Sequence, residues 1–418
     1  MKKINKLIFS LLLCGTLCTG FTACSDTDTK PGKDDDGGLI EDVSEVVVSL
    51  NRNYAYGRVV ESDDGTLIAT GEQLSGYDSG IPIYRSSDGG ATWNKNQKNI
   101  HDHDYNNGAY DAKWQPTLYV LPQDVGTTLK KGDVMLVATS IDAGADNYNL
   151  VSINLYRSTD IGLTWTWMSE IQRSTRDATH NGCWEGNLYI NDNGELVCIF
   201  ADETLHDVYN QRIVLRTTTD GVNWSEIQNV IALEDQYNLR PGMPVVTKIK
   251  DGKYFLVTEM VGESGVPIYW RTSDDGINWG DVNWKGNLIS VNDKITDLLS
   301  GREMDTVAFP GSSPYAVWTP KGGVNGTLYV TSQRTNYTQG SPADRAVNNM
   351  FVSYDLGATW QKLKHPLTYT QDNNMRPAYS NSMTISNDGN YMYVINTMIV
   401  EEVSTVNNVL VFTKAKLK

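Results

Sequence analysis

The stretch SYDLGATW, residues 353–360, has four near copies earlier in this chain of 418 residues. The copies are SSDGGATW from Ser86, STDIGLTW from Ser158, TTTDGVNW from Thr217 and TSDDGINW from Thr272. We call these five segments the octets. In an octet, the Asp can accept backbone N–H bonds and the Gly can adopt a positive φ, so each octet predicts a hairpin turn that follows a strand.

We expect the octets to have a structural role. Their residue types form neither a nucleophile nor an acid–base pair at this spacing, whereas the final Trp can pack into a neighbouring unit. Thr219 stands where the other four copies have Asp, so we expect the third turn to be held less firmly than the others.

A second repeat lies between the octets. An apolar strand, a Gly-containing turn and another apolar strand occur six times, at residues 57–72, 116–140, 186–203, 242–259, 314–333 and 379–397. Such units, each with several strands, predict an all-β fold, a six-bladed β-propeller. The segment around Val47 can add a strand to the last blade and so close the ring.

Composition limits the partners of the protein. The formal net charge of −15 argues against nucleic acid, because phosphate binding needs clustered Lys and Arg. The chain has 11 Trp and 22 Tyr beside 7 Phe, a balance that suits sugar-binding surfaces and also many other secreted all-β proteins. We expect a monomer without a cofactor.

The N-terminus predicts a targeting segment. Lys2, Lys3 and Lys6 precede the apolar run LIFSLLLCGTLCTGF, which is too short to span a membrane, so residues 1–23 predict a signal peptide. The stretch FTAC, which ends at Cys24, resembles the signal of bacterial lipoproteins, in which this Cys carries lipid. Residues 24–42 would then be the lipid-attachment Cys and an acidic flexible linker, and residues 43–418 the propeller.

The lipoprotein resemblance implies a bacterial outer-membrane lipoprotein that faces the periplasm or the cell surface. Its only membrane contact would be the lipid anchor. The acidic run after Cys24 also resembles the surface-export signal of lipoproteins from the Bacteroides group, and the alternative is a solvated linker with no signal.

We expect no metal site. The run HDHD, residues 101–104, could bind a cation, but a polar loop is the simpler interpretation. Cys183 and Cys198 flank one predicted hairpin, and we expect two buried free thiols because their positions are not symmetric about its turn.

The register of the six hairpins predicts one shared site. If each first strand is innermost in its blade, the residues at its beginning converge on the axis, namely Tyr56 and Arg58, Gln115, Glu185, Arg240, Ser313 and Arg376. The second strand runs back, so its last residues reach the same rim, namely Glu72, Thr139, Ala201, Glu259, Gln333 and Asn396. Trp114, Trp184 and Tyr379 lie beside these positions in the sequence. We expect the octets at the other end of the strands.

Paired carboxylates in a concave, aromatic-rimmed cavity suit glycoside hydrolysis, because one protonates the leaving oxygen while the other attacks the sugar or stabilises its charge. Glu185 and Glu259 lie at the ends of mostly apolar strands, where desolvation raises a carboxyl pKa. The alternative is that each Glu pairs with Arg58, Arg240 or Arg376 and has no chemical role.

The octets resemble the Asp box of the sialidase superfamily. Residues 184–203, 211–224 and 240–259 resemble the central part of the exo-α-1,5-L-arabinanases, a family of six-bladed propellers with retaining chemistry. This resemblance implies that Glu185 is the general acid/base, that Glu259 is the nucleophile and that Tyr379 supports it by hydrogen bonding. The candidate substrate-binding residues are Arg58, Glu72, Gln115, Trp184, Arg240 and Arg376. The sequence WEGN departs from the family pattern after the Glu, which leaves the substrate open.

Two alternatives remain at this stage. The stretch AYSNSMTI resembles the Tyr motif of the sialidases, which implies a Tyr379 nucleophile activated by Glu259, a carboxylate-binding Arg58 and Asp78 as a weak candidate for the acid. The sialidase signature Arg-Ile-Pro is missing at Arg58. The second alternative is a surface propeller that binds glycans without cleaving them, in which the channel Glu residues are locked into Arg pairs. We predict an exo-acting retaining glycoside hydrolase whose substrate is an oligosaccharide or polysaccharide.

Overall fold

The computed structural model describes residues 40–49, 54–73, 80–103, 110–142, 149–177, 181–341, 349–367, 379–399 and 408–418. All of them belong to one compact unit, Asp36–Lys418. The predicted signal peptide, Cys24, Asp78, Asp104 and Arg376 lie outside the described residues. Within the described ranges, the chain has no helix that is long and apolar enough to cross a membrane.

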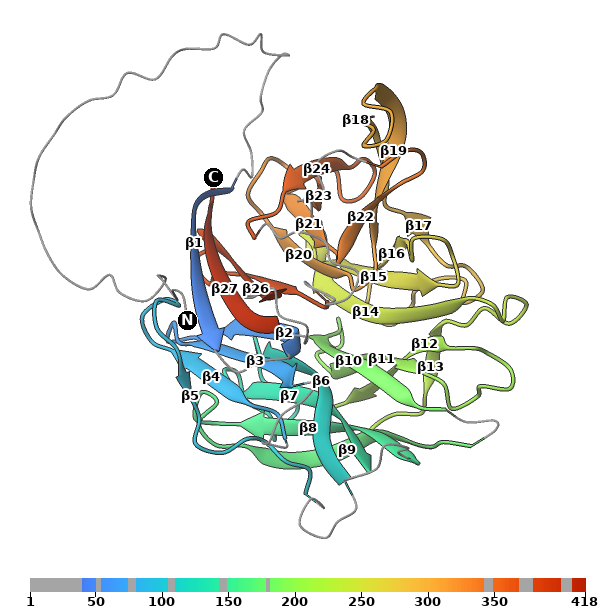
Figure 1. Cartoon of the computed structure of the whole chain (residues 1–418). Helices are drawn as coiled ribbons and strands as arrows, with labels where there is room; N and C mark the ends of the chain where they lie inside the picture. Colours follow the sequence, from blue (N-terminus) through green and yellow to red (C-terminus); the bar gives the residue numbers. More distant parts are fainter. Residues whose placement is uncertain are drawn as a thin grey trace, which may run out of the picture. The chain divides into compact units, whose positions relative to one another are not determined.

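The described strands form seven antiparallel sheets (Figure 1), which confirms the all-β expectation. The first sheet contains β2 (Tyr54–Glu61), β3 (Leu67–Gln73), β4 (Ile83–Ser86) and β5 (Asn94–Lys95). The second contains β6 (Tyr110–Val120), β7 (Val134–Asp142), β8 (Leu150–Ser158) and β9 (Thr166–Thr175). The third contains β10 (Cys183–Ile190), β11 (Leu196–Asp202), β12 (Arg212–Thr218) and β13 (Gln228–Ile231).

The remaining strands complete three more sheets of four strands and one of three. The fourth sheet contains β14 (Arg240–Lys248), β15 (Tyr254–Val261), β16 (Ile268–Ser273) and β17 (Asn287–Leu288), with a 3-10 helix, η2 (Lys250–Gly252), in its first turn. The fifth contains β20 (Tyr315–Thr319), β21 (Thr327–Thr331), β23 (Asn349–Ser353) and β24 (Gln361–Lys364). The sixth contains β25 (Ser382–Ile385), β26 (Tyr391–Ile399), β27 (Asn408–Leu417) and β1 (Ile40–Ser49).

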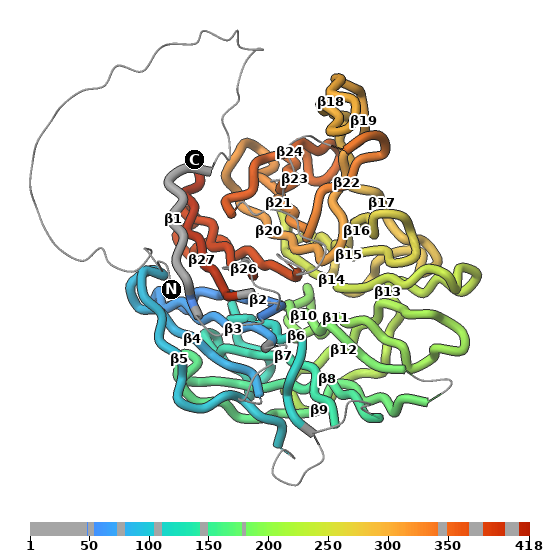
Figure 2. The backbone as a smooth tube through the Cα atoms, viewed as in Figure 1, coloured from blue at the N-terminus to red at the C-terminus, as the bar shows by residue number. Residues whose placement is uncertain are grey.

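The first strand of the described chain joins its last. β1 pairs with β27, with Val47 opposite Val411, so the segment around Val47 adds a strand to the sixth sheet as expected. Figure 1 shows β1 in blue beside β27 in red, and Figure 2 shows the tube of β27 next to that of β26 in the same sheet. β1 begins at Ile40, inside the segment that the sequence analysis assigns to the linker. The pairing gives an otherwise exposed sheet edge its hydrogen-bond partners.

The six four-stranded sheets follow one another around a common centre (Figure 1). Their first strands contact each other in chain order, from β2 through β6, β10, β14 and β20 to β25, and β25 contacts β2. A three-stranded sheet was not expected from the sequence; it consists of β18 (Val291–Thr296), β19 (Glu303–Gly311) and β22 (Arg334–Tyr337). Its strands are half exposed and lack the continuous apolar run that marks the six repeats.

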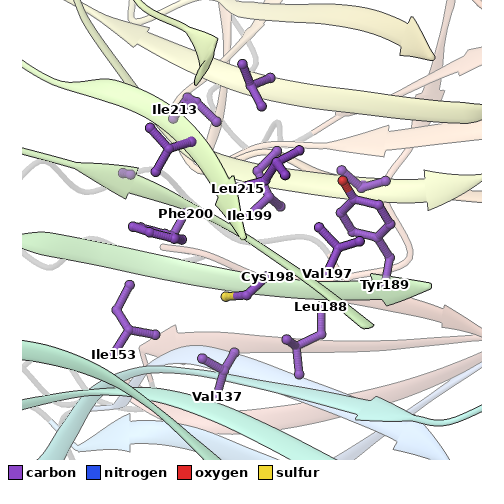
Figure 3. Close-up of a cluster of buried hydrophobic side chains, with 14 of the residues drawn as sticks. Val137, Ile153, Leu188, Tyr189, Val197, Cys198, Ile199, Phe200, Ile213 and Leu215 are labelled. Atoms are coloured by element: carbon purple, nitrogen blue, oxygen red, sulfur yellow. The ribbon is translucent and has the colours of Figure 1, made fainter. Parts of the chain in front are cut away.

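The core lies between neighbouring sheets. Every residue of β11 is buried, which is why this strand reads as a nearly continuous apolar run rather than as an alternating one. Figure 3 shows Val137 of the second sheet in one cluster with Leu188 and Cys198 of the third. Cys183 and Cys198 are both buried and free, as expected. Packing of this kind joins each sheet to the next.

The octets turn from the third strand of a sheet to the fourth. In the first octet, Asp88 Oδ1 accepts hydrogen bonds from the Ser86 hydroxyl at 2.7 Å and the Thr92 N–H at 2.9 Å. Gly90 has a φ of 91° and donates its N–H to Ser86 Oγ at 2.9 Å. Ser86 pairs with Leu67, the first residue of β3, so the octet lies at the end of the sheet opposite Glu72.

The third octet corrects one expectation. Its turn is shorter, with Thr218 in the place of the first Ser and Asp220 in the place of the Asp, so the absence of Asp at Thr219 does not weaken it. Asp220 accepts bonds from the N–H groups of Val222 and Asn223, both at 2.8 Å, and these donors hold its pKa well below the usual range. An alignment of the octets without gaps does not distinguish this shorter turn from the longer one.

Each octet also fastens its sheet to the preceding one. The ring of Trp93 lies 5.2 Å from that of Phe412 in the sixth sheet, and the ring of Trp360 lies 6.2 Å from that of Phe255 in the fourth. A side chain on Gly90 would collide with Phe412, which explains the small residue at this close approach. The octets are therefore part of the packing between sheets.

Candidate active site

Seven residues that are not glycine have a left-handed backbone conformation near the centre of the sheets. They are Tyr56 (φ 51°), Gln115 (54°), Glu185 (65°), Met243 (50°), Ser312 (63°), Ser313 (51°) and Ser380 (55°), and each four-stranded sheet has at least one of them in or just before its first strand. In β2, β6, β10 and β14 the pairing register shifts at these residues, which marks β-bulges. Such a backbone costs on the order of 1–2 kcal/mol per residue, and strain of this kind clusters at functional sites.

One small cavity lies among the bulges. All six four-stranded sheets contribute to its lining, which consists of Tyr56, Arg58, Gln115, Thr117, Glu185, Gly186, Asn187, Met243, Pro244, Val245, Pro314 and Ser380. The bulges therefore surround a common axis. A more open hollow of about 560 Å³ lies between the fourth and fifth sheets, but no titratable side chain lines it.

The structure corrects one position of the predicted ring. The bulge of the fourth sheet is at Met243, because β14 begins at Arg240 and bends only further along the strand. In the sixth sheet the left-handed residue is Ser380, and the predicted Arg376 lies outside the described residues. The alignment used the beginning of each apolar run as its reference, and the number of residues between that point and the bulge differs among the sheets.

The ends of the second strands occupy equivalent places in the first four sheets. Glu72, Thr139, Ala201 and Glu259 each pair with the residue directly before a bulge residue, namely Ala55, Trp114, Trp184 and Gly242. Two of the four are carboxylates. Antiparallel pairing thus brings Glu72 and Glu259 to the same rim as Glu185.

Glu185 is held by donors from two other sheets. Its Oε2 accepts the Met243 N–H at 2.6 Å, and its Oε1 accepts the Tyr56 hydroxyl at 3.3 Å. Burial raises the pKa of Glu185 to about 7, and the neighbouring Glu259 adds to the rise, while Arg240 opposes it. A carboxyl group with this pKa can both give and take a proton near neutrality.

Glu259 lies at the end of β15 and is only 5% exposed. Its Oε2 accepts the Ser313 N–H at 2.8 Å. Burial raises its pKa, while the Ser313 N–H and Arg240 favour the charged form and limit the rise. Glu259 therefore has a dedicated donor that stabilises a carboxylate in a desolvated place.

Gly242 brings the two carboxyl groups together. A Cβ atom on Gly242 would lie 3.3 Å from Glu259 Oε1 and 3.5 Å from Glu185 Oε2, so both oxygens border the space beside this residue. The φ of Gly242 is not in the left-handed region, and the glycine is explained by crowding rather than by backbone conformation.

The arginines do not neutralise this pair. Arg240 donates to Glu203 Oε1 at 2.9 Å, and Glu203 Oε2 accepts the Trp184 indole N–H at 3.2 Å. Arg58 donates to the carbonyl and hydroxyl oxygens of Ser380 at 2.7 and 2.9 Å. Within the described ranges, neither Glu185 nor Glu259 forms an ion pair.

Two tyrosines stand beside the carboxyl pair. The rings of Tyr56 and Tyr379 meet edge to face with centroids 5.4 Å apart. Burial, with Glu259 and Glu185 adding to it, raises the pKa of the Tyr379 hydroxyl well above its usual value. This hydroxyl remains protonated at neutral pH.

Glu72 and Gln115 face each other. Glu72 Oε2 accepts the Gln115 N–H at 3.0 Å, and Gln115 Oε1 accepts both the Glu185 N–H at 3.1 Å and the Thr139 hydroxyl at 2.9 Å. Glu72 is 6% exposed, and burial raises its pKa to about 8, although Gln115 and Arg58 oppose the rise. The sequence analysis expected substrate contacts here, and the structure shows both side chains bonded to protein groups.

The described part of the chain contains no cluster of His, Cys, Asp and Glu that could hold a metal ion. His101 pairs with Asp111 at 3.0 Å, and His103 pairs with Asp102 at 2.8 Å. Each described His of the HDHD run therefore has a carboxylate partner.

The fold is similar to that of several solved structures. The α-L-arabinanase of Penicillium chrysogenum, solved with arabinobiose, superposes with a TM-score of 0.69 and 30% identity, over 91% of this chain and 98% of that one. The GH93 α-L-arabinofuranosidase of Fusarium graminearum, also solved with arabinobiose, gives a TM-score of 0.67 and 26% identity, over 91% of this chain and 98% of that one. This chain belongs to the GH93 α-L-arabinanase family.

A Hadza microbial sialidase shares only the fold with this GH93 chain, with a TM-score of 0.54 and 14% identity over 87% of this chain and 66% of that one. No protein-family model and no curated protein matches the chain.

Sequence reasoning missed three groups of this GH93 site. It did not assign Glu203, which is 2% exposed and holds both Arg240 and Trp184. It also missed the N–H groups of Met243 and Ser313 as donors to the carboxyl pair, because backbone donors leave no mark in side-chain patterns. The acidic pair Asp202 and Glu203, at the end of β11 and directly after it, was the sequence signal that could have identified Glu203.

Proposed function

We propose that this protein is an exo-acting retaining glycoside hydrolase of the sialidase superfamily that cleaves terminal arabinan-type linkages. The observation that carries the proposal is the pair Glu185 and Glu259, which border the same space beside Gly242 without an ion-pair partner among the described residues. The two GH93 neighbours that were solved with arabinobiose support an arabinose-containing substrate.

The environments of the two carboxyl groups support different roles. Glu185, with a pKa of about 7, would protonate the leaving oxygen while Glu259 attacks the anomeric carbon and the glycosidic bond breaks. Glu185 would then take a proton from the incoming water, which attacks the same carbon and releases the Glu259 carboxylate. The Ser313 N–H supports Glu259 as the nucleophile, because this donor stabilises the carboxylate before attack and after release.

The arrangement of the sheets supports a propeller with six blades. In this proposal the six four-stranded sheets are the blades, the three-stranded sheet is an insertion and the octets are Asp boxes. Trp184 and Arg240, which share Glu203, would contact the sugar, and Arg58 would shape the floor of the site. Arg376 stays a candidate from the sequence alone.

The two other functions have less support. A sialidase mechanism needs an ionisable Tyr379, and burial beside two carboxyl groups opposes its ionisation. To bind a substrate carboxylate, Arg58 would have to break its hydrogen bonds to Ser380. In a binding module without catalysis, we would expect Glu185 and Glu259 to be held in ion pairs with Arg. Their hydrogen-bond donors are instead uncharged, namely the Met243 N–H, the Ser313 N–H and the Tyr56 hydroxyl.

The proposal includes the cellular context expected from the sequence. Cys24 would carry lipid, and the protein would be a monomer anchored in the bacterial outer membrane. Palmitate labelling of the expressed protein and of Cys24→Ala would test the anchor, because only the parent would take up label.

Hydrolysis tests the central part of the proposal. The chain from Ser25 onward would be incubated with linear α-1,5-arabino-oligosaccharides and, separately, with a sialylated oligosaccharide. We expect release of a short arabinose product by the parent and its loss in both Glu185→Gln and Glu259→Gln. Free sialic acid would favour the sialidase mechanism, and glycan binding that survives both changes without cleavage would favour a binding module.

A further inference from the structure

We propose that Glu72 and Gln115 are positioning residues that fix the backbone of Glu185, and with it the direction of the Glu185 carboxyl group. The sequence suggested that both residues bind substrate. Their contacts indicate an action through Glu185 instead. Their role in catalysis rests on the proposed function of Glu185 as the acid/base, whereas their effect on the Glu185 backbone does not.

The three residues form a continuous series of hydrogen bonds across three sheets. It runs from the Glu72 carboxyl of the first sheet to the Gln115 N–H of the second, and from the Gln115 side chain to the Glu185 N–H of the third. The Glu185 carboxyl continues the series to the Met243 N–H of the fourth. Each link ends on the N–H of a left-handed residue.

These N–H groups need acceptors because of the bulges. A bulge takes one residue out of the ladder, so its N–H has no partner in its own sheet, and an unpaired buried N–H costs about 1–3 kcal/mol. At Glu185 the acceptor is supplied by Gln115. Without this acceptor, the left-handed conformation of Glu185, with a φ of 65°, would still be strained, and no hydrogen bond of its N–H would offset the strain.

Glu72 and Glu259 show how one position serves two purposes. Both lie near the end of the second strand of a sheet, both pair with the residue before a bulge, and both accept the N–H of a left-handed residue of the next sheet. Glu259 keeps Oε1 beside Gly242, next to Glu185. Glu72 instead bonds to Gln115, whose side chain stands between it and the Glu185 backbone.

The charged neighbours of Glu72 are Arg58, Glu185 and Lys113. Burial and the Glu185 carboxylate raise the pKa of Glu72 to about 8, so Glu72 still holds its proton where Glu185, with a pKa of about 7, loses its own. A neutral Gln at position 72 therefore resembles the protonated Glu72 and keeps an oxygen for the Gln115 N–H. Rescue by this conservative variant provides a readout that a role limited to overall stability would not give.

The test compares substitutions that remove an acceptor with one that keeps it. Gln115→Leu and Glu72→Ala remove acceptors, whereas Glu72→Gln keeps an amide oxygen for the Gln115 N–H and removes only the charge. In crystal structures at one pH, we expect Glu185 to leave its left-handed conformation, or its carboxyl group to leave the Met243 N–H, in Gln115→Leu but not in Glu72→Gln.

Kinetics on arabino-oligosaccharides supply the second readout. We expect kcat to fall about tenfold to a hundredfold in Gln115→Leu and Glu72→Ala with KM within about threefold, because misplacement of a catalytic group has this size of effect. In Glu72→Gln, we expect kcat near that of the parent and an alkaline limb of the pH profile at the same pH, because Glu72 is neutral where Glu185 titrates.

Three results would overturn the inference. These are an unchanged Glu185 in the Gln115→Leu structure, a rise in KM without a fall in kcat, and a kcat in Glu72→Gln that is as low as that in Glu72→Ala. If Gln115→Leu does not fold, the comparison of Glu72→Gln with Glu72→Ala still decides. If the parent cleaves no arabinan, the proposed function fails, and the crystal structures still decide whether Gln115 fixes Glu185.

Discussion

The two ends of the sheets hold carboxylates in opposite states. At the octet end, Asp88 accepts bonds from Thr92 and Ser86 in an exposed turn, and these donors lower its pKa to about 2. At the bulge end, Glu185 is desolvated and lies beside a second carboxyl group, and its pKa rises to about 7. The same strands thus carry permanent anions at one end and proton carriers at the other.

The difference shows what separates a structural carboxylate from a chemical one. Asp88 of the first octet accepts hydrogen bonds from the hydroxyl groups of Ser86 and Thr92 and from the Thr92 N–H, so its charge is needed for the turn. Glu185 accepts two donors and Glu259 one, all from other sheets, and each keeps one oxygen beside Gly242. Local donors lower a pKa and make a residue structural, whereas burial with few donors raises it and leaves the proton mobile.

The largest expected effect is the loss of the proton carrier. Glu185→Gln should lower kcat/KM on arabino-oligosaccharides by about 10²–10⁴-fold, because general acid catalysis contributes on this scale. Steady-state kinetics would measure the loss. An aryl arabinoside with a good leaving group needs little protonation and should lose much less, and an equal loss on both substrates would contradict the acid role.

Crowding between the two carboxyl groups should have a smaller effect. In Gly242→Ala the new Cβ atom would stand 3.3 and 3.5 Å from the two carboxyl oxygens, so we expect kcat/KM to fall about tenfold or more. The melting temperature should change little, because Gly242 does not need a left-handed backbone. An active variant with parental kinetics would show that no substrate atom uses this space.

At the octet end, the comparison predicts lost stability without lost activity. Asp88→Ala removes the acceptor of Ser86 and Thr92, and we expect a melting temperature about 2–4 °C lower at pH 7 and a kcat/KM within twofold of the parent. The pKa of Asp88 is lowered in the folded protein, so its contribution is present above about pH 4 and lost as the pH falls towards 2. The difference between variant and parent should therefore disappear in acid, and a difference that persists at pH 2 would contradict this origin.

Glu72 should affect stability alone, with the opposite pH dependence. Its pKa is raised from 4.5 to about 8 in the folded protein, so the unfolded chain releases this proton first and stability falls as the pH rises between these values. Glu72→Gln lacks the titration, and its melting temperature should exceed that of the parent at pH 9 and approach it at pH 4. Calorimetry at both pH values would measure this, and a constant difference would contradict the raised pKa.

The sequence predicted those parts of the molecule that repeat. Six apolar hairpins and five octets predicted the all-β sheets and the contacts of Trp93 and Trp360 with the preceding sheets, because buried strands and tight turns limit residue choice. The expected last residues of the second strands, Glu72 and Glu259, also lie in equivalent places.

What the sequence did not predict depends on bulges and on backbone groups. A bulge has no fixed residue type, so the alignment placed Arg240 where the structure has Met243. The short turn at Asp220 has a hydroxyl donor and backbone N–H donors, as the longer octets do, but one residue fewer, and the sequence pattern was interpreted as a defect. The three-stranded sheet has too few apolar residues to be recognised.

The most direct test of the account is to locate the covalent intermediate. Glu185→Gln would be mixed with an aryl arabinoside that has a good leaving group, so that the intermediate forms without an acid and breaks down slowly without a base, and the protein would be digested for mass spectrometry. The account predicts an arabinosyl group on the peptide that contains Glu259. A sugar on Tyr379 or on another residue, or inverted product with no adduct, would contradict it.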